Sequence, residues 1–349
     1  MLSKEVFLKQ FEGRFGQFLH LQRCIDGLIK DAFNREGVPH LYVQSRVKSA
    51  DSAFQKVERK KYESPFEEMT DIVAVRIIVY LNSEVELAKQ KITALFEVDD
   101  FKSTDKRQPR AADVVGYRSL HMICSLGLNR AMLDEYAGIC EIPFEVQIRT
   151  VLEHAWAEIE HKQNYKSKIA LPSDLQRRLM VVAGALELAD RELSNIADDA
   201  IEYADLVSAN STETEDDWLS ETSLGALVSD FASKSSIPMA VQSSGNTDLE
   251  RLIEELNSFG IKRIGEARGL LGKQRERLVS VKETEPNTIY GLIRNAMILE
   301  DYPKYFNKAY QGDFFFRFEE VEALANVLGI RAQEFRTYLK NSGVEVFVD

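Results

Sequence analysis

The first half of the chain alternates between helical and extended patterns of hydrophobic residues. Residues 1–40 carry apolar side chains at helical spacing, and residues 83–96 repeat that pattern. Residues 71–81 and 144–150 are instead short runs rich in β-branched residues, which favour strands. Further extended segments are predicted at 41–50 and 116–126, with a helix capped by Ser49 or Ser52 running to Lys61 and a charge-rich loop at 99–115. Strands that alternate with helices predict an α/β fold.

The second half of the chain has the pattern of helices only. Residues 151–164 and 174–207 are amphipathic, and the second stretch is long enough for one or two helices. The polar stretch 211–218 is the best linker, so we expect one domain over 1–210 and an all-α domain of unknown role over 219–349. Within that second domain, helices are predicted at 248–260, 264–281, 288–310, 318–329 and 332–343.

The composition is that of a soluble globular protein, with 44% hydrophobic and 29% charged residues. No apolar run approaches the roughly 18 to 20 residues that span a bilayer, and the N-terminus has no continuous apolar core of a signal peptide. A cytoplasmic location is therefore expected. The cysteines, Cys24, Cys124 and Cys140, are far apart and form no Cys-x-x-Cys pair, so free thiols are expected.

The distribution of charge points to a small phosphorylated ligand. A formal net charge of −12 argues against general binding to nucleic acid, which depends on neutralising phosphates. Within this acidic chain, residues 46–61 and 102–110 are basic islands. Two such islands suit phosphorylated small molecules.

Three polar side chains recur at a spacing of four residues after Arg46. Lys48, Ser52 and Lys56 would share one face of a helix there and offer two cations and a hydroxyl to a triphosphate. A lysine stripe alone is more often a solvated face, so this interpretation depends on its neighbours.

Two charged residues belong to the predicted strand at 71–81. Arg76 interrupts an apolar run, and a buried guanidinium needs a carboxylate, a phosphate or an aromatic face. Asp71 opens the strand, where a carboxylate can hold Mg²⁺, although a turn residue is the plainer interpretation.

Two further strands alternate apolar residues with residues that carry chemistry. Glu145, Gln147 and Arg149 share one face of 144–150. Ser119 and His121 share a face of 116–126 with Tyr117, whose ring could stack on a base. A solvent-exposed polar face is the alternative for both strands.

In order along the chain, these motifs resemble the synthetase domain of the RelA/SpoT alarmone synthetases over residues 40–170. The resemblance implies a mixed β-sheet flanked by helices, related to nucleotidyltransferases. It also implies a Mg²⁺-dependent transfer of the β,γ-pyrophosphoryl group of ATP to the 3′ hydroxyl of GDP or GTP, with AMP released.

The resemblance assigns roles to individual residues. Arg46, Lys48, Ser52 and Lys56 would contact the ATP phosphates, and Arg76 would stack on adenine. Asp71 and Glu145 would hold Mg²⁺ as the catalytic carboxylates, with Glu145 also a candidate to activate the 3′ hydroxyl. Tyr117 would stack on guanine, and His121, Gln147 and Arg149 would line the acceptor side.

Two positions depart from the family pattern. Asp113, Val114, Val115 and Gly116 stand where many members have Lys-Pro-x-Gly, and His154 stands where some small synthetases have Asn. The choice of acceptor among GDP, GTP and other substrates therefore stays open.

Three further features of the sequence bear on other kinds of site. His154, Glu158 and His161 fall on one helical face and could bind a metal, though the family uses this helix for support. The stretch around Lys273 lacks the spacing of a phosphate-binding loop. No His-Asp dipeptide occurs, so we expect a synthetase without the alarmone hydrolase domain.

The leading prediction is a stand-alone (p)ppGpp synthetase that uses ATP and GDP or GTP, needs Mg²⁺, has no membrane partner and forms a homo-oligomer. One alternative is a toxic relative that pyrophosphorylates the 3′ end of tRNA, which the negative charge disfavours. Another is a catalytically silent nucleotide sensor whose C-terminal helices bind a protein.

Overall fold

The computed structural model describes residues 3–105, 119–166, 172–209, 212–240, 247–281, 286–312 and 314–347, with the backbone alone for 161–166 and 247–248. The chain divides into two compact units, Met1–Ile196 and Ala197–Asp349, and each has a hydrophobic core of its own. The division lies within one helix and before the linker predicted at 211–218. The domain boundaries drawn from the sequence therefore stay a prediction.

Unit 1 is built on a five-stranded mixed sheet in the order β1-β2-β5-β4-β3. The neighbours β2 and β5 are parallel, and the other three pairs are antiparallel. The mixed sheet expected from the sequence is confirmed. The strands are β1 (Tyr42–Val47), β2 (Val73–Val79), β3 (Glu97–Asp105), β4 (Leu120–Ser125) and β5 (Phe144–Thr150).

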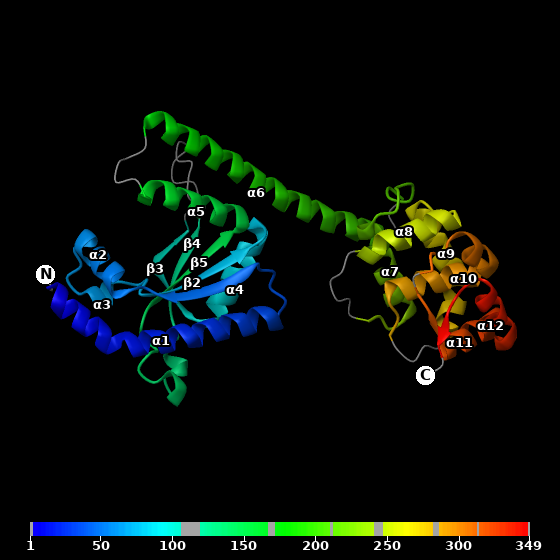
Figure 1. Ribbon diagram of the computed structural model, residues 1–349, viewed down its shortest axis with the longest axis horizontal. Helices are drawn as coiled ribbons and strands as arrows, with labels where there is room; N and C mark the ends of the chain where they lie inside the picture. Colours follow the sequence, from blue (N-terminus) through cyan, green and yellow to red (C-terminus); the bar gives the residue numbers. More distant parts are fainter. Residues whose placement is uncertain are drawn as a thin grey trace. The chain divides into compact units, whose positions relative to one another are not determined.

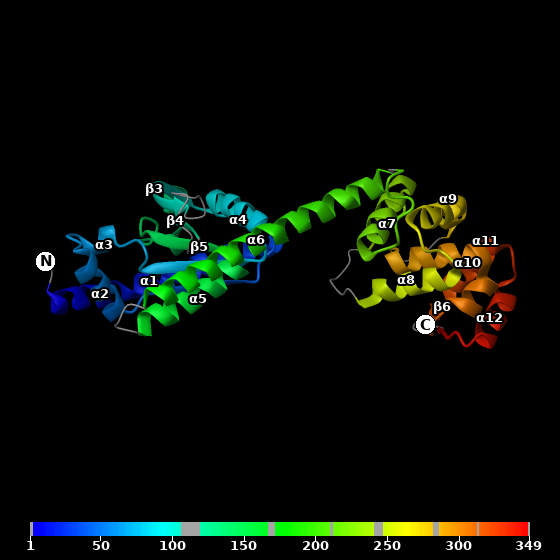
Figure 2. The same cartoon turned by 90° about the horizontal axis from the view of Figure 1, so that it is seen from above.

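Helices cover both faces of this sheet. The long helix α1 (Lys4–Arg35) and α4 (Asn82–Leu95) pack on the face to which Phe144 points. On the opposite face lie α5 (Val151–Lys166) and the first part of α6 (Ser173–Ser208), as Figures 1 and 2 show. The alternation of β5 explains this arrangement, because its apolar residues face the α1 side while its polar residues face the α5 side.

Short elements connect the strands at the end of the sheet where β2 and β5 begin. Helix α2 (Ala50–Lys60) follows β1, and its N-cap is Ser49, one of the two residues predicted to cap it. Helix α3 (Pro65–Glu68) follows, with proline at its first position. The turns η1 (Leu128–Arg130) and η2 (Asp134–Tyr136) join β4 to β5.

One element of unit 1 was predicted wrongly. Residues 99–105 were expected in a charge-rich loop but belong to β3, which lies at the edge of the sheet. Its pairing with β4 shifts register between Asp99 and Thr104, and most of its side chains are at least partly exposed. An irregular edge strand with charged side chains lacks the apolar alternation that identifies a strand.

Unit 2 is helical apart from one small strand pair. The five helices predicted from the sequence are present, but α7 (Glu221–Ser235) was missed although Leu224, Leu227 and Val228 give it an apolar stripe. The all-α expectation is corrected by two strands of two residues each, β6 and β7, which pair in parallel. The remaining elements are α8 (Thr247–Phe259), α9 (Ile264–Ser280), α10 (Ile289–Lys308), β6 (Phe316–Arg317), α11 (Phe318–Leu328), α12 (Ala332–Asn341) and β7 (Val346–Phe347).

A buried ionic group lies in the core of unit 2. The carboxylate of Glu255 is 1% exposed, and the guanidinium of Arg294 binds both of its oxygens. The hydroxyl of Tyr305 donates a further hydrogen bond to it. A buried carboxylate needs such partners, so this group fixes α8 against α10. Among the helices that the structure describes, none is both long and apolar enough to cross a bilayer.

The core of unit 1 gives a direct test of the fold. Phe144 is fully buried and packs edge-on against Phe96, with ring centroids 5.1 Å apart. Phe144→Ala should destabilise unit 1 by about 3 to 5 kcal/mol because it removes a large side chain from a packed core. Phe101 is fully exposed, and Phe101→Ala should change stability by less than about 0.5 kcal/mol. Urea unfolding followed by circular dichroism measures both, and equal shifts for the two variants would contradict the fold.

Candidate active site

Three rows of side chains cross the face of the sheet that α5 covers. The strand registers place Arg46, Ala74 and Glu145 in one row and Gln44, Arg76, Gln147 and His121 in the next. A third row holds Tyr42, Ile78 and Arg149. Residues that alternate along separate strands thus meet on one surface because β1, β2, β5 and β4 are neighbours.

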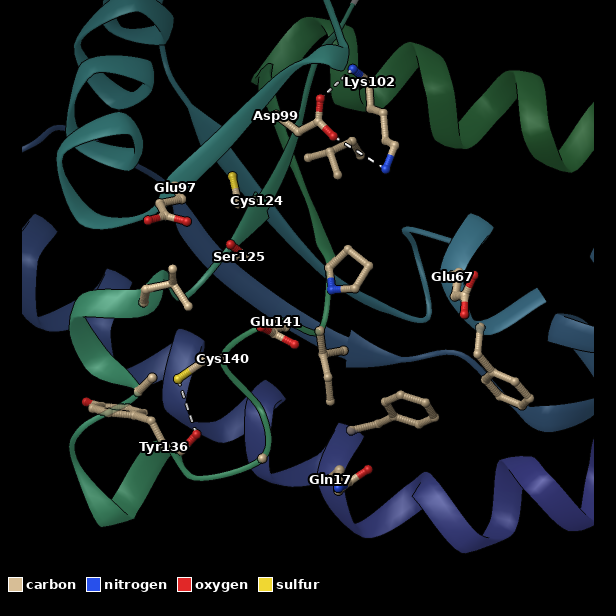
Figure 3. A pocket seen from close by; sticks show the side chains of 18 of the residues that line it. Gln17, Glu67, Glu97, Asp99, Lys102, Cys124, Ser125, Tyr136, Cys140 and Glu141 are labelled. Carbon is tan, nitrogen blue, oxygen red and sulfur yellow. Dashed lines mark hydrogen bonds and ion pairs between the residues drawn. The ribbon is translucent and has the colours of Figure 1, made fainter. Parts of the chain in front are cut away.

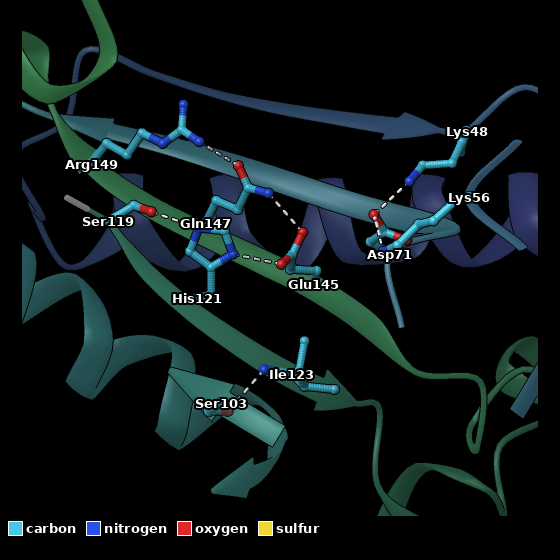
Figure 4. A network of polar contacts seen from close by, with 10 residues as sticks. All are labelled: Lys48, Lys56, Asp71, Ser103, Ser119, His121, Ile123, Glu145, Gln147 and Arg149. Atoms are coloured by element: carbon cyan, nitrogen blue, oxygen red, sulfur yellow. Dashed lines mark hydrogen bonds and ion pairs between the residues drawn. The ribbon is translucent and has the colours of Figure 1, made fainter. Parts of the chain in front are cut away.

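A continuous chain of hydrogen bonds runs through the polar residues of β4 and β5. The Nδ1 atom of His121 lies 2.6 Å from Oε1 of Glu145, and its Nε2 atom lies 2.5 Å from Oγ of Ser119. The amide of Gln147 donates to Glu145 (2.7 Å) and accepts from Arg149 (3.0 Å), as Figure 4 shows. Every side chain in this chain is at least half-buried, so the geometry of Glu145 is fixed from both sides.

Two lysines hold the carboxylate of Asp71 just before β2. Nζ of Lys48 donates to Oδ2 at 2.5 Å, and Nζ of Lys56 lies 2.9 Å from the same oxygen. Burial alone would raise the pKa of Asp71, but the hydrogen bonds from the two lysines outweigh it and lower the pKa. Asp71 is therefore ionised at neutral pH.

Glu145 is also held in its charged form. Burial favours the neutral acid, yet the contacts with His121 and Gln147 lower the pKa of Glu145 below its ordinary value. The negative charge of Asp71 acts in the opposite direction and raises the pKa of Glu145. Both carboxylates are therefore ionised, and each carries its negative charge in a largely buried site.

These carboxylates fit a divalent cation. The second oxygen of Asp71, Oδ1, is buried and has no hydrogen-bond partner among the described residues. Hard cations such as Mg²⁺ take oxygen ligands and commonly use one or two protein carboxylates together with substrate phosphates. Asp71 and Glu145 supply such a donor set.

Arg76 is partly exposed rather than buried, and it has a carboxylate partner. Its Nη1 atom donates to Oε1 of Glu158, on α5, at 3.0 Å. The adjacent Arg149 is buried, and burial together with the charge of Arg76 lowers its pKa to about 10. One face of the sheet therefore combines fixed cations with a pair of carboxylates.

The alternative metal site on α5 loses two of its three members to other contacts. Nε2 of His154 lies 2.7 Å from the hydroxyl of Tyr42, and Glu158 is bound to Arg76. Among the residues whose side chains are described, no group of three or more His, Cys, Asp or Glu has metal-binding geometry. The side chain of His161 lies outside the described residues.

The remaining predicted residues occupy different positions relative to this surface. Arg46 lies in the same row as Glu145 and is exposed. Lys48 precedes α2, so the helical spacing argument applies only to Ser52 and Lys56 within the helix. Ser52 is exposed and accepts a hydrogen bond from the hydroxyl of Ser49. Tyr117, like the unusual residues 113–116, lies outside the described residues.

Sequence reasoning missed Tyr42 altogether. Its hydrogen bond to His154 becomes visible only when β1 is paired with β2, because no local motif surrounds it. The pairing of Arg76 with Glu158 was equally hidden, since 82 residues separate them in sequence. Both contacts depend on tertiary structure rather than on spacing.

A cavity of about 810 Å³ lies near the start of β5, and none of the site residues predicted from the sequence lines it. Ile123, the cross-strand neighbour of Glu145, forms part of its wall. Four carboxylates and two cations line it, so an anionic phosphate is disfavoured there. Figure 3 shows the labelled residues around it, among them Glu67, Glu97, Asp99, Glu141 and Lys102.

Comparison with known proteins agrees with this description. The family described as "Region found in RelA / SpoT proteins" matches residues 45–170. GTP pyrophosphokinase YjbM of Bacillus subtilis (strain 168) is 31% identical over 160 residues, which cover 45% of this chain and 72% of that protein. GTP pyrophosphokinase YwaC of the same organism is 32% identical over 167 residues, covering 45% of this chain and 74% of that protein.

Among solved structures, that of the small alarmone synthetase 1 from Bacillus subtilis aligns with a TM-score of 0.48 and 26% identity. The alignment covers 55% of this chain and 98% of that one. The sequence matches carry the assignment, and the residues that match the family, 45–170, include both lysines and both carboxylates described above. The chain therefore belongs to the RelA/SpoT family.

Proposed function

We propose that this protein is a pyrophosphokinase that transfers the β,γ-pyrophosphoryl group of ATP to the 3′ hydroxyl of GDP or GTP. The observation that carries the proposal is the pair of ionised carboxylates, Asp71 and Glu145, beside Lys48 and Lys56 on one face of the sheet. Two relatives that share this region are named GTP pyrophosphokinases.

The donor nucleotide is proposed to bind along β1, α2 and β2. Lys48 and Lys56 would exchange their contact with Asp71 for contacts with the phosphates, and Arg46 and Ser52 extend the same polar surface. Arg76 is held by Glu158 with its guanidinium on the sheet face, a geometry that supports stacking on a base.

The acceptor is proposed to bind on the side of β4. His121, Gln147 and Arg149 form the fixed polar chain there, and Tyr117 is proposed to stack on guanine. Because these side chains already bond to one another, binding requires little reorganisation.

The reaction needs an ionised base, and it needs cations that stabilise the negative charge on the transferred pyrophosphoryl group. The 3′ oxygen attacks the β-phosphorus of ATP, the bond from that phosphorus to the α,β-bridging oxygen breaks, and AMP leaves. Glu145 would accept the proton of the hydroxyl, and its lowered pKa supports this role because the side chain is ionised at neutral pH. Lys48 and Lys56 balance charge on the transferred group.

Asp71 and Glu145 are the residues that would hold Mg²⁺. When bound, the ion would neutralise phosphate charge and orient the triphosphate. The buried Oδ1 of Asp71, with no hydrogen-bond partner among the described residues, supports this role.

The tRNA-modifying alternative remains a second candidate, because residues 113–116 depart from the family pattern. The net charge of −12 favours a mononucleotide over tRNA. A cytoplasmic location stays a prediction from the sequence, and no role is proposed for residues 219–349.

Transfer of label from β,γ-labelled ATP tests the proposed acceptor. With Mg²⁺ present, GDP, GTP, GMP and deacylated tRNA are offered side by side and the products are separated by chromatography. We expect label on GDP or GTP. Label on tRNA alone would replace the proposal by the tRNA-modifying function, and transfer to none of the four would favour a silent nucleotide sensor.

Removing the charge of Glu145 tests the proposed chemistry. Glu145→Gln preserves the volume of the side chain but removes a charge, so transfer should fall on the order of 100-fold or more while the fold is retained. Glu141→Gln makes the same change on the exposed segment before β5 and should keep near-normal turnover. Steady-state rates and circular dichroism measure both. Normal turnover in Glu145→Gln would refute this assignment.

A further inference from the structure

Ser119 lies directly before β4, and the protein encloses its side chain. The residue is 0% exposed, so its hydroxyl is not placed to contact a substrate. A buried hydroxyl needs a hydrogen-bond partner, and the Oγ atom of Ser119 has one in Nε2 of His121, 2.5 Å away. Figure 4 shows this contact at one end of the polar chain that leads to Glu145. Ser119 can therefore act on the candidate site through His121.

The opposite end of the chain fixes the direction of its hydrogen bonds. A guanidinium donates and cannot accept, so Nη2 of Arg149 turns the amide oxygen of Gln147 toward itself, at 3.0 Å. The amide nitrogen of Gln147 then points to Oε2 of Glu145, at 2.7 Å. The other carboxylate oxygen, Oε1, is the one that faces His121. Each oxygen of Glu145 thus has its own neighbour.

The same reasoning assigns the proton on the ring of His121. A carboxylate accepts hydrogen bonds, so Nδ1 of His121, which lies 2.6 Å from Oε1 of Glu145, must carry a proton. In the neutral ring the opposite nitrogen, Nε2, is then an acceptor, and Ser119 supplies a hydroxyl that can donate to it. The hydrogen bond at one ring nitrogen decides whether the other carries the proton.

We propose that Ser119 is a positioning residue that holds His121 in the tautomer with the proton on Nδ1. The proposal rests on the proposed function, because it takes Glu145 to serve the transfer reaction. By donating to Nε2, the hydroxyl of Ser119 keeps the ring proton on the side of Glu145. The carboxylate then has a donor at each oxygen, and its plane is fixed.

A fixed carboxylate plane matters because each oxygen has a second lone pair. His121 and Gln147 each use one lone pair, so the remaining ones have a defined direction, in which Mg²⁺ and the substrate hydroxyl would be bound. Without the hydroxyl of Ser119, the ring proton is free to move to Nε2. Nδ1 would then turn a lone pair toward Oε1 of Glu145, and two acceptors that face each other repel. Glu145 would leave its position.

The tautomer can be measured in the full chain without metal or nucleotide. Nitrogen-15 NMR of the histidine side chains, at a pH where the ring is neutral, distinguishes a protonated ring nitrogen from an accepting one. His121→Gln identifies the signals of His121 by their loss. We expect the proton on Nδ1 in the wild type, and on Nε2 or shared between the two nitrogens in Ser119→Ala. A wild-type proton on Nε2, or an unchanged tautomer in Ser119→Ala, would overturn the proposal.

The transfer reaction gives a second readout. Ser119→Ala should lower kcat about 10- to 100-fold, which is typical when the partner that orients a metal ligand is removed. KM for ATP should stay near its wild-type value, since Ser119 is enclosed. Ser119→Thr keeps a hydroxyl and should retain the Nδ1 tautomer and most of kcat. If the two variants lost kcat equally, the hydroxyl would not be the cause and the proposal would fail.

Ser125→Ala is the matched control, because it makes the same change at the other end of β4. It should leave the tautomer of His121 and kcat unchanged, and a loss equal to that of Ser119→Ala would contradict a specific role for Ser119. The two readouts also separate this proposal from the function on which it rests. If the wild type transferred label to no nucleotide, the proposed function would fail, while the tautomer comparison would still decide the role of Ser119.

Discussion

The parallel pairing of β2 with β5 is the constraint on which the candidate site depends. It brings β2, which Asp71 precedes, beside the strand that carries Glu145, so that both carboxylates lie toward the same end of the sheet and the charge of Asp71 acts on Glu145. The antiparallel neighbours β1 and β4 add cations from one side and His121 from the other. A slip of one residue in any of these registers would turn the polar rows into the core.

Electrostatic compensation keeps this surface folded without substrate. Asp71 forms ion pairs with two lysines, and Arg76 forms one with Glu158. Glu145 is bound by His121 and Gln147. Most of these charged side chains are at least half-buried, and each has a partner. The pairing offsets the cost of taking the charges out of water. The same contacts hold the side chains in place for a ligand. They therefore both stabilise the folded protein and preorganise the candidate site.

Most of the fold could be predicted from the sequence. The apolar runs of β2 and β5 identify them as strands, and the amphipathic pattern of the helices identifies them as helices. It failed at β3, whose charged edge residues hide the strand pattern, and at the contact of Tyr42 with His154, which depends on strand pairing. Candidate residues such as Asp71 and Glu145 could be chosen by their place on strands. Their partners could not, because the contacts of Lys56 with Asp71 and of His121 with Glu145 form only when the chain folds.

A double-mutant cycle on the two carboxylates tests the central claim most directly. Binding of Mn²⁺, a spectroscopic substitute for Mg²⁺, is measured in the presence of a non-hydrolysable ATP analogue for the wild type, Asp71→Asn, Glu145→Gln and the double variant. If the two residues hold one ion, the losses will not add, and the double variant will bind about as weakly as the weaker single variant. Additive losses would mean that Asp71 and Glu145 act independently and would contradict a shared metal site.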